Sequence, residues 1–132
     1  MPPALSATFF QKAAARFYTV TPCRILDTRD SDGPLAGPAL AAGASRTFTI
    51  AGTCGVPADA TAVALNATVT GATDPGSLTI YPGTGPAPET NTIDFVAGKT
   101  RANNVSMGLA GGALSVLDRQ QAGTVDFILD VS

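Results

Sequence analysis

One short stretch gathers many of the side chains that could do chemistry. Residues 22–33 read PCRILDTRDSDG and include a cysteine, two arginines and three aspartates, in a chain where only 14% of residues are charged. Two nearby carboxylates could serve as general acid and base, and three could bind calcium. The same groups could instead pair with one another and shape a turn. The stretch is therefore a reactive centre, a metal site or an architectural element.

Calcium binding is the most specific of the chemical alternatives. Asp27, Asp30 and Asp32 bring carboxylate oxygens together just before a glycine. An EF-hand is excluded, because the aligned loop has Ala39 where the bidentate ligand should be. A looser site made by the three aspartates stays open. In the structural alternative, Arg24 or Arg29 pairs with Asp27 while the other aspartates shape turns. We expect this alternative, and no cofactor.

Catalysis is disfavoured by what the sequence lacks. The chain has no histidine, which removes the commonest general base and the usual partner of a nucleophilic serine or cysteine. Carboxylate pairs remain, but the chain has no tryptophan and only two tyrosines, Tyr18 and Tyr81, to stack on a sugar. We therefore expect a protein that is not an enzyme.

Charge and hydropathy exclude two further partner classes. Eight basic and ten acidic residues give a net charge of −2, which offers no cationic patch for phosphates. No run of apolar residues is long enough to span a bilayer as a helix. We expect neither nucleic acid binding nor a membrane-spanning segment.

The two cysteines, Cys23 and Cys54, lie 31 positions apart. With two thiols and no histidine, a structural zinc site is excluded, and the spacing is not that of a C-x-x-C redox pair. A disulfide is the expected state, and two buried free thiols are the alternative. A disulfide would indicate an oxidising compartment, and hence an extracellular or cell-surface location.

The elements that must position these residues are strands. Glycine and proline together number 24, and apolar and polar residues alternate with period two between the turns they mark. The clearest case is TAVALNATVT (61–70), which places Val63 and Leu65 on one face and Asn66 on the other. Nine strands are predicted, at 16–20, 23–27, 45–51, 61–70, 76–82, 91–98, 101–109, 112–118 and 123–131.

Nine short strands with turns between them predict an all-β fold. The expected architecture is an antiparallel two-sheet sandwich, jelly-roll-like, over residues 16–132, and a closed barrel is the alternative. Residues 1–15 would form an N-terminal arm that carries Leu5, Phe9 and Phe10. Within the arm, residues 4–15 could be a short helix or an added strand.

Several polar and aromatic residues are candidate ligand contacts. Asparagine amides next to strands usually satisfy backbone groups at bulges and strand ends, although they could also bind carbohydrate. The candidates are Asn66, Tyr81, Asn91, Asn103 and Asn104.

The order of the motifs resembles a β-rich module that recurs in secreted and surface-attached bacterial proteins. The resemblance covers residues 17–131 and rests on FYTVTPCRILDTR, AGTCGVPADATAVALNATVT, GSLTIYPGTG, TNTIDFVAGKTRANNVSMGL and VDFILDV. It implies a secreted domain that often accompanies catalytic or adhesive domains and has no established chemistry of its own.

Together these inferences predict a structural or adhesive subunit of the bacterial cell surface or extracellular matrix. An apolar arm ahead of a sandwich could pair with an exposed strand edge of the next molecule. A head-to-tail contact of this kind gives a filament, so the expected partner is a second copy of the chain. The alternative is a module that binds carbohydrate or a cell-wall polymer.

Overall fold

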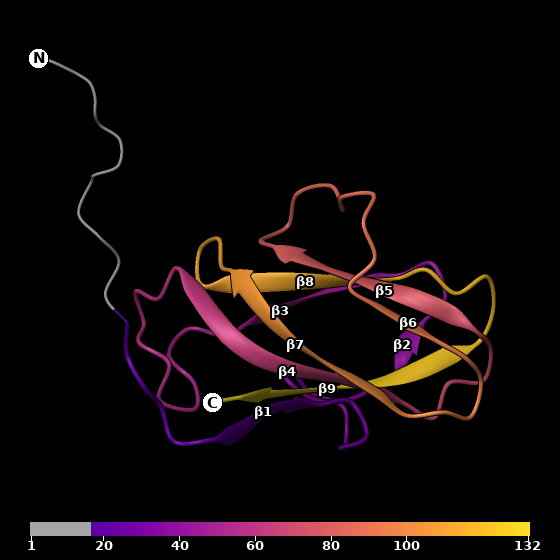
Figure 1. Ribbon diagram of the computed structural model, residues 1–132, viewed down its shortest axis with the longest axis horizontal. Coiled ribbons are helices and arrows are strands. Elements are labelled where there is room, and N and C mark those ends of the chain that lie inside the picture. Colours follow the sequence, from indigo (N-terminus) through magenta and orange to yellow (C-terminus); the bar gives the residue numbers. More distant parts are fainter. Residues whose placement is uncertain (1–16) are drawn as a thin grey trace, which may run out of the picture.

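Nine strands follow one another in residues 17–132, the part of the chain that the computed structural model describes (Figure 1). Their bounds are β1 Cys23–Asp27, β2 Leu40–Ala41, β3 Ser45–Thr49, β4 Ala62–Thr70, β5 Gly76–Pro82, β6 Ile93–Phe95, β7 Arg101–Gly108, β8 Ala113–Asp118 and β9 Thr124–Val131. The described residues include no helix, and therefore none that could cross a membrane.

The strands form two separate sheets in which every pairing of strands is antiparallel. The five-stranded sheet has the order β1-β9-β4-β7, and β2 also pairs with β9; the four-stranded sheet has the order β3-β8-β5-β6. The two layers face each other in Figure 1. The predicted sandwich is confirmed, and the closed barrel is wrong.

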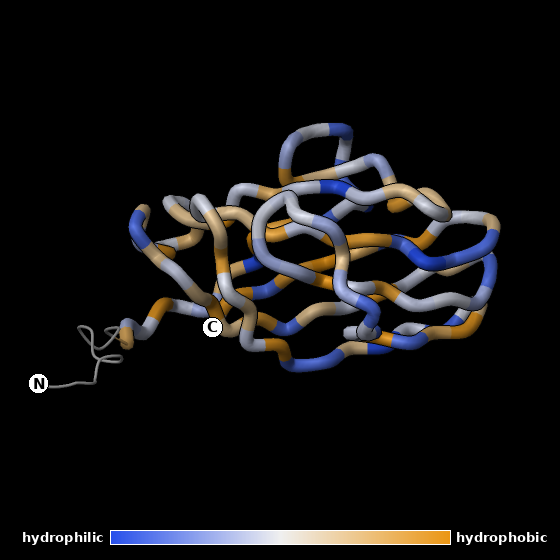
Figure 2. Tube along the Cα trace, turned by 90° about the horizontal axis from the view of Figure 1, so that it is seen from above, coloured by the Kyte–Doolittle hydropathy of each residue, from blue (hydrophilic) through white to orange (hydrophobic). Residues whose placement is uncertain are grey.

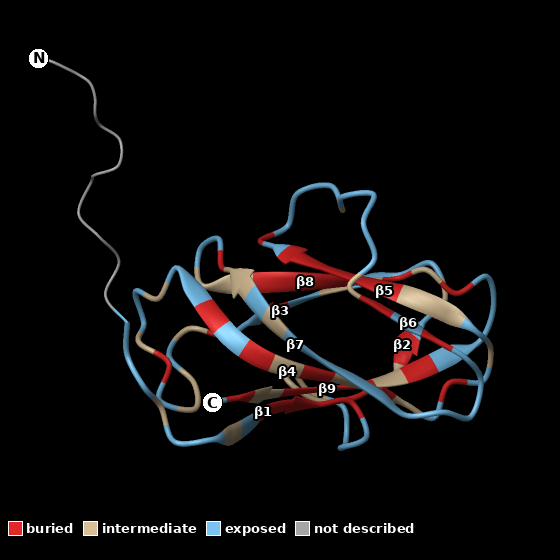
Figure 3. Ribbon diagram, viewed as in Figure 1, coloured by how far each residue is buried: buried red, intermediate tan, exposed pale blue. Residues whose placement is uncertain are grey.

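The core lies between the two layers and comes from the predicted alternation. On β4 every second side chain is buried: Val63, Leu65, Ala67 and Val69. Figure 2 shows hydrophobic and hydrophilic residues alternating along the strands, and Figure 3 shows the buried positions inside the sandwich. Phe48 of β3 and Phe127 of β9 connect the sheets, with ring centroids 6.4 Å apart.

Two features of the strand prediction need correction. The predicted strand at 16–20 is wrong, because the described residues 17–22 have no regular structure. Their side chains favour strands, but a strand forms only where a neighbour offers backbone partners, and Pro22 interrupts the passage into β1. The sequence also missed β2, whose two residues are too short to show a period.

Candidate functional site

The motif PCRILDTR lies along β1 and the turn after it, at one edge of the five-stranded sheet. Pairing with β9 shifts register between Arg24 and Leu26. Ile25, Leu26 and Asp27 are all buried, and Arg24 is the one exposed residue of the strand. The bulge falls directly after Arg24, between the exposed start of the strand and its buried end.

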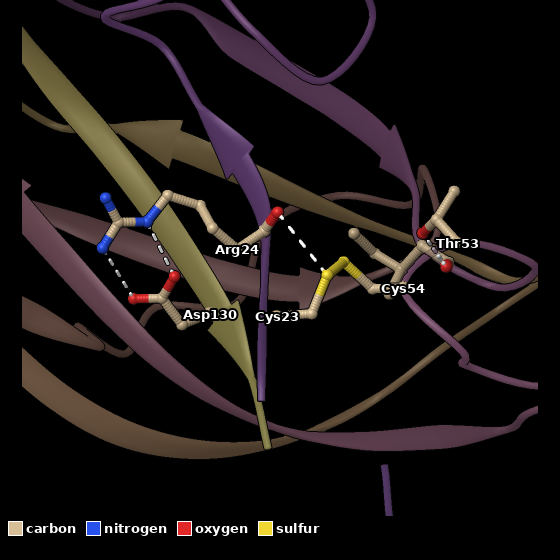
Figure 4. The surroundings of a disulfide bond; sticks show 6 residues. Cys23, Arg24, Thr53, Cys54 and Asp130 are labelled. Carbon is tan, nitrogen blue, oxygen red and sulfur yellow. Dashed lines mark hydrogen bonds and ion pairs between the residues drawn. A yellow bond between two sulfur atoms is a disulfide. The ribbon is translucent and has the colours of Figure 1, made fainter. Parts of the chain in front are cut away.

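A disulfide anchors the start of this strand. Cys23 is bonded to Cys54, with Cα atoms 5.8 Å apart, and Cys54 belongs to the turn-rich segment between β3 and β4 (Figure 4). The hydroxyl of Thr53 donates to the carbonyl of Ile50 within that segment. The predicted disulfide is thus confirmed, and it joins the first strand of one sheet to the loop that follows an edge strand of the other.

Next to the disulfide, the side chain of Arg24 forms an ion pair with Asp130 of β9. Its Nε donates to Asp130 Oδ1 at 2.8 Å and its Nη2 to Oδ2 at 3.3 Å (Figure 4). This is the two-pronged geometry in which a guanidinium binds a carboxylate most specifically. The hydrogen bonds that Arg24 donates to Asp130 raise the pKa of Arg24. The pair cross-links two neighbouring strands.

Asp27 is the buried carboxylate of the motif, and Arg29 satisfies it. Both the Nε and the Nη2 of Arg29 donate to Asp27, at 2.9 and 2.8 Å, and the backbone N–H of Arg29 donates at 3.0 Å. Arg24 Nη1 lies 3.9 Å from Asp27 Oδ2. These hydrogen bonds, led by those of the Arg29 side chain, lower the pKa of Asp27 to about 2, although burial opposes the shift. The carboxylate is fully engaged as an ionised acceptor.

Thr28 completes this β1–β9 polar cluster, which we define as Arg24, Asp27, Thr28, Arg29, Asp126 and Asp130. The Thr28 hydroxyl donates to Asp126 Oδ1 and accepts the N–H of Phe127, both at 2.8 Å. Its backbone N–H donates to the carbonyl of Phe127. The arrangement extends the pairing with β9 beyond the end of β1.

The other two aspartates of the motif shape the turn through their backbones. The carbonyl of Asp30 accepts the N–H of Gly37 at 3.0 Å, and Asp32 forms an isolated bridge with Gly37. A Cβ on Gly37 would lie 2.5 Å from the Asp30 carbonyl, so this close approach requires glycine.

These positions bear on the calcium hypothesis. Asp27 is committed to two arginines, whereas Asp30 and Asp32 belong to the turn. Within residues 17–132, no three acidic, histidine or cysteine side chains are grouped so as to hold a metal ion. Asp27, Asp30 and Asp32 are therefore not grouped so that they could coordinate one ion together.

The candidate ligand contacts fall into two groups. Three are engaged or covered: Asn91 donates to Asp94, Asn103 donates to the carbonyl of Thr92, and Tyr81 is only 7% exposed. Asn66 and Asn104 are instead direct cross-strand partners on β4 and β7. They face outward, because the residues on either side of Asn66 point into the core.

Just before the disulfide, the chain displays aromatic side chains. Phe17 is 89% exposed and Tyr18 is 61% exposed. No backbone group in residues 17–22 hydrogen-bonds to another described residue. Residues 19–23 line a shallow hollow together with Cys54 and Gly55, and Val20 packs against the core there. The predicted arm residues Leu5, Phe9 and Phe10 lie outside the described residues.

Sequence reasoning missed a buried polar pair at the end of β8. Asp118 is 0% exposed and lies on the core side beside Leu78; its Oδ1 accepts the N–H of Gln120, while Oδ2 has no partner among the described residues. Gln120 donates to the carbonyls of Asp74 and Thr124, and its own Oε1 has no donor there. Burial raises the pKa of Asp118, opposed by the hydrogen bond from Gln120.

The chain matches no protein-family model, no curated protein and no solved structure. The resemblance to the surface module stays a prediction, and the residue roles above rest on geometry.

Proposed function

We propose that this protein is a non-catalytic structural or adhesive subunit of the cell surface or extracellular matrix, and that it assembles with copies of itself through its N-terminal segment. The observation that carries the proposal is the pair of exposed aromatic rings at Phe17 and Tyr18. They lie on a segment whose backbone groups have no partner among the described residues. Contact with a partner molecule would bury these two rings and give these backbone groups hydrogen-bond partners.

The surroundings of the segment support this role. The disulfide between Cys23 and Cys54 fixes the chain directly behind it, so that force on the segment would pass into both sheets. A disulfide also fits an oxidising location outside the cytoplasm. The charges of the β1–β9 polar cluster pair with one another, within β1 and the turn after it and across to β9, which suits a scaffold that transmits force.

Light scattering on three variants tests the proposal. Deletion of residues 1–15 and the double substitution Phe17→Ser/Tyr18→Ser should each reduce assembly of the purified protein. Val96→Ser is the matched control, because Val96 is another exposed apolar side chain, at 47% exposure, in a different part of the fold. Assembly that survives both N-terminal changes would contradict the role of this segment.

A second candidate function is binding of carbohydrate or a cell-wall polymer. Asn66 and Asn104 favour it, because two amides side by side on an outward sheet face could hydrogen-bond to sugar hydroxyls. Binding on a glycan array should then disappear in Asn66→Ala/Asn104→Ala and persist in Asn91→Ala, since Asn91 is engaged with Asp94. Equal binding by the two variants would exclude this surface.

A further inference from the structure

The five-stranded sheet ends in a long strand with one unpaired side. β7 has eight residues, whereas the other edge strands are shorter: β1 and β3 have five each, β6 has three and β2 has two. Within the described part of the chain, its only strand partner is β4. Residues 101–104 are exposed on both faces of the sheet (Figure 3). Such an edge is a template for another strand.

The register shows which backbone groups of β7 are free. The N–H of Leu109, just beyond β7, donates to Thr61 on the β4 side. Hydrogen-bonding direction alternates along an antiparallel strand, and the register with β4 is continuous. Backbone groups at 102, 104, 106 and 108 therefore point away from β4, and no described residue pairs with them.

Side chains restrict where a new strand could add. Arg101 lies opposite the core residue Val69 in the register with β4, so it is on the inward side of the sheet. An inward-pointing charge on an edge strand discourages the addition of another strand at that point. Farther along β7, Val105 and Met107 are half-buried and pack against the core. A strand added over residues 104–108 would cover this apolar surface.

The segment before β1 has the properties of such a strand. Residues 17–21 read FYTVT, and all five residues favour strands. They follow one another without regular structure or backbone partners among the described residues. In Figure 1 this indigo segment runs along one end of the sandwich, where Val20 is partly buried against the core while its neighbours are exposed. It continues into β1, at the opposite edge of the sheet from β7.

We propose that residues 17–21 of one copy add as a strand to residues 104–108 of β7 in a second copy. This inference rests on the proposed function and names its two contact surfaces. Because donor and acceptor lie at opposite edges of one sheet, the contact is head-to-tail and leaves both surfaces free at the ends of every assembly. Repetition therefore gives an open filament whose copies are joined through their five-stranded sheets.

Ser106→Pro tests the acceptor edge. Proline removes the outward N–H of residue 106 but leaves the donors that face β4, and proline is tolerated on an edge strand. Ser106→Ala is the matched control, because it keeps the N–H. We expect light scattering to show assembly for wild type and Ser106→Ala and its loss for Ser106→Pro, with similar thermal unfolding for all three.

Cross-linking tests the pairing itself. Thr19→Cys and Ser106→Cys proteins, mixed and oxidised, should give dimers that reducing agent separates, because residues 19 and 106 are the centres of the two paired segments. Thr19→Cys mixed with Thr47→Cys, on the edge of the other sheet, should not. Assembly that persists in Ser106→Pro, or cross-links only at Thr47, would overturn the β7 contact while leaving the proposed function intact. A wild-type protein that never assembles would overturn both.

Discussion

Thr28 shows how one side chain can serve two strands. Its hydroxyl accepts the buried N–H of Phe127 and donates to Asp126, both at 2.8 Å. Thr28→Val keeps the shape but leaves that N–H without an acceptor, which should cost about 1–3 kcal/mol in the free energy of unfolding. Thr28→Ser, which retains the hydroxyl, should stay close to wild type. Urea denaturation measures both, and equal stability of the two variants would contradict this account.

Asp118 gives the domain an unusual dependence on pH. Burial raises its pKa, so between the unfolded and folded values the folded state binds more protons than the unfolded state. Stability should therefore fall as pH rises above the unfolded value of 3.8 and level off above the folded value. Asp118→Asn should remove this part of the decline. Thermal unfolding across the pH range measures it, and identical pH profiles for the two proteins would show that Asp118 is not responsible.

At the scale of elements, the disulfide joins β1 to the loop after β3. A closed loop of this length stabilises a fold by about 3–4 kcal/mol in the chain-entropy model. At roughly 3 °C per kcal/mol for a chain of this size, Cys23→Ser/Cys54→Ser should therefore lower the melting temperature by about 9–12 °C. Calorimetry measures the shift, and the wild-type protein under reducing conditions should match the variant. An unchanged melting temperature would mean that the bond does not constrain the fold.

The long strands were predictable because their alternation is complete. β4, β5 and β9 were all found with nearly correct bounds. The strand predicted at 16–20 was wrong for a physical reason. Its residues favour the strand conformation, but no neighbouring strand among the described residues pairs with them. β2 consists of two residues whose position depends on β9, which comes about 80 residues later.

The site was predictable only where its partners are local. Pairing of Asp27 with Arg29, two residues away, could be inferred from the motif. The partners of Arg24 and Thr28 lie on β9, about a hundred residues later, and a single sequence does not reveal that register. Asp118 did leave a signal, because it continues the inward alternation of Leu114 and Val116.

At the scale of the whole molecule, the groups that stabilise the fold lie apart from the edge proposed for assembly. The polar cluster and the disulfide hold one edge of the five-stranded sheet, and the exposed segment 17–21 extends from that edge. At the opposite edge, the far side of β7 has no strand partner among residues 17–132. Self-association in this arrangement would leave the core unchanged, so copies can add without unfolding.

Electron microscopy of the purified, intact chain tests the central claim most directly. Self-assembly through the N-terminal segment predicts unbranched filaments that lengthen with protein concentration, since each added copy presents a new free edge. Particles that stay single and uniform in size at every concentration, with the native disulfide intact, would contradict it.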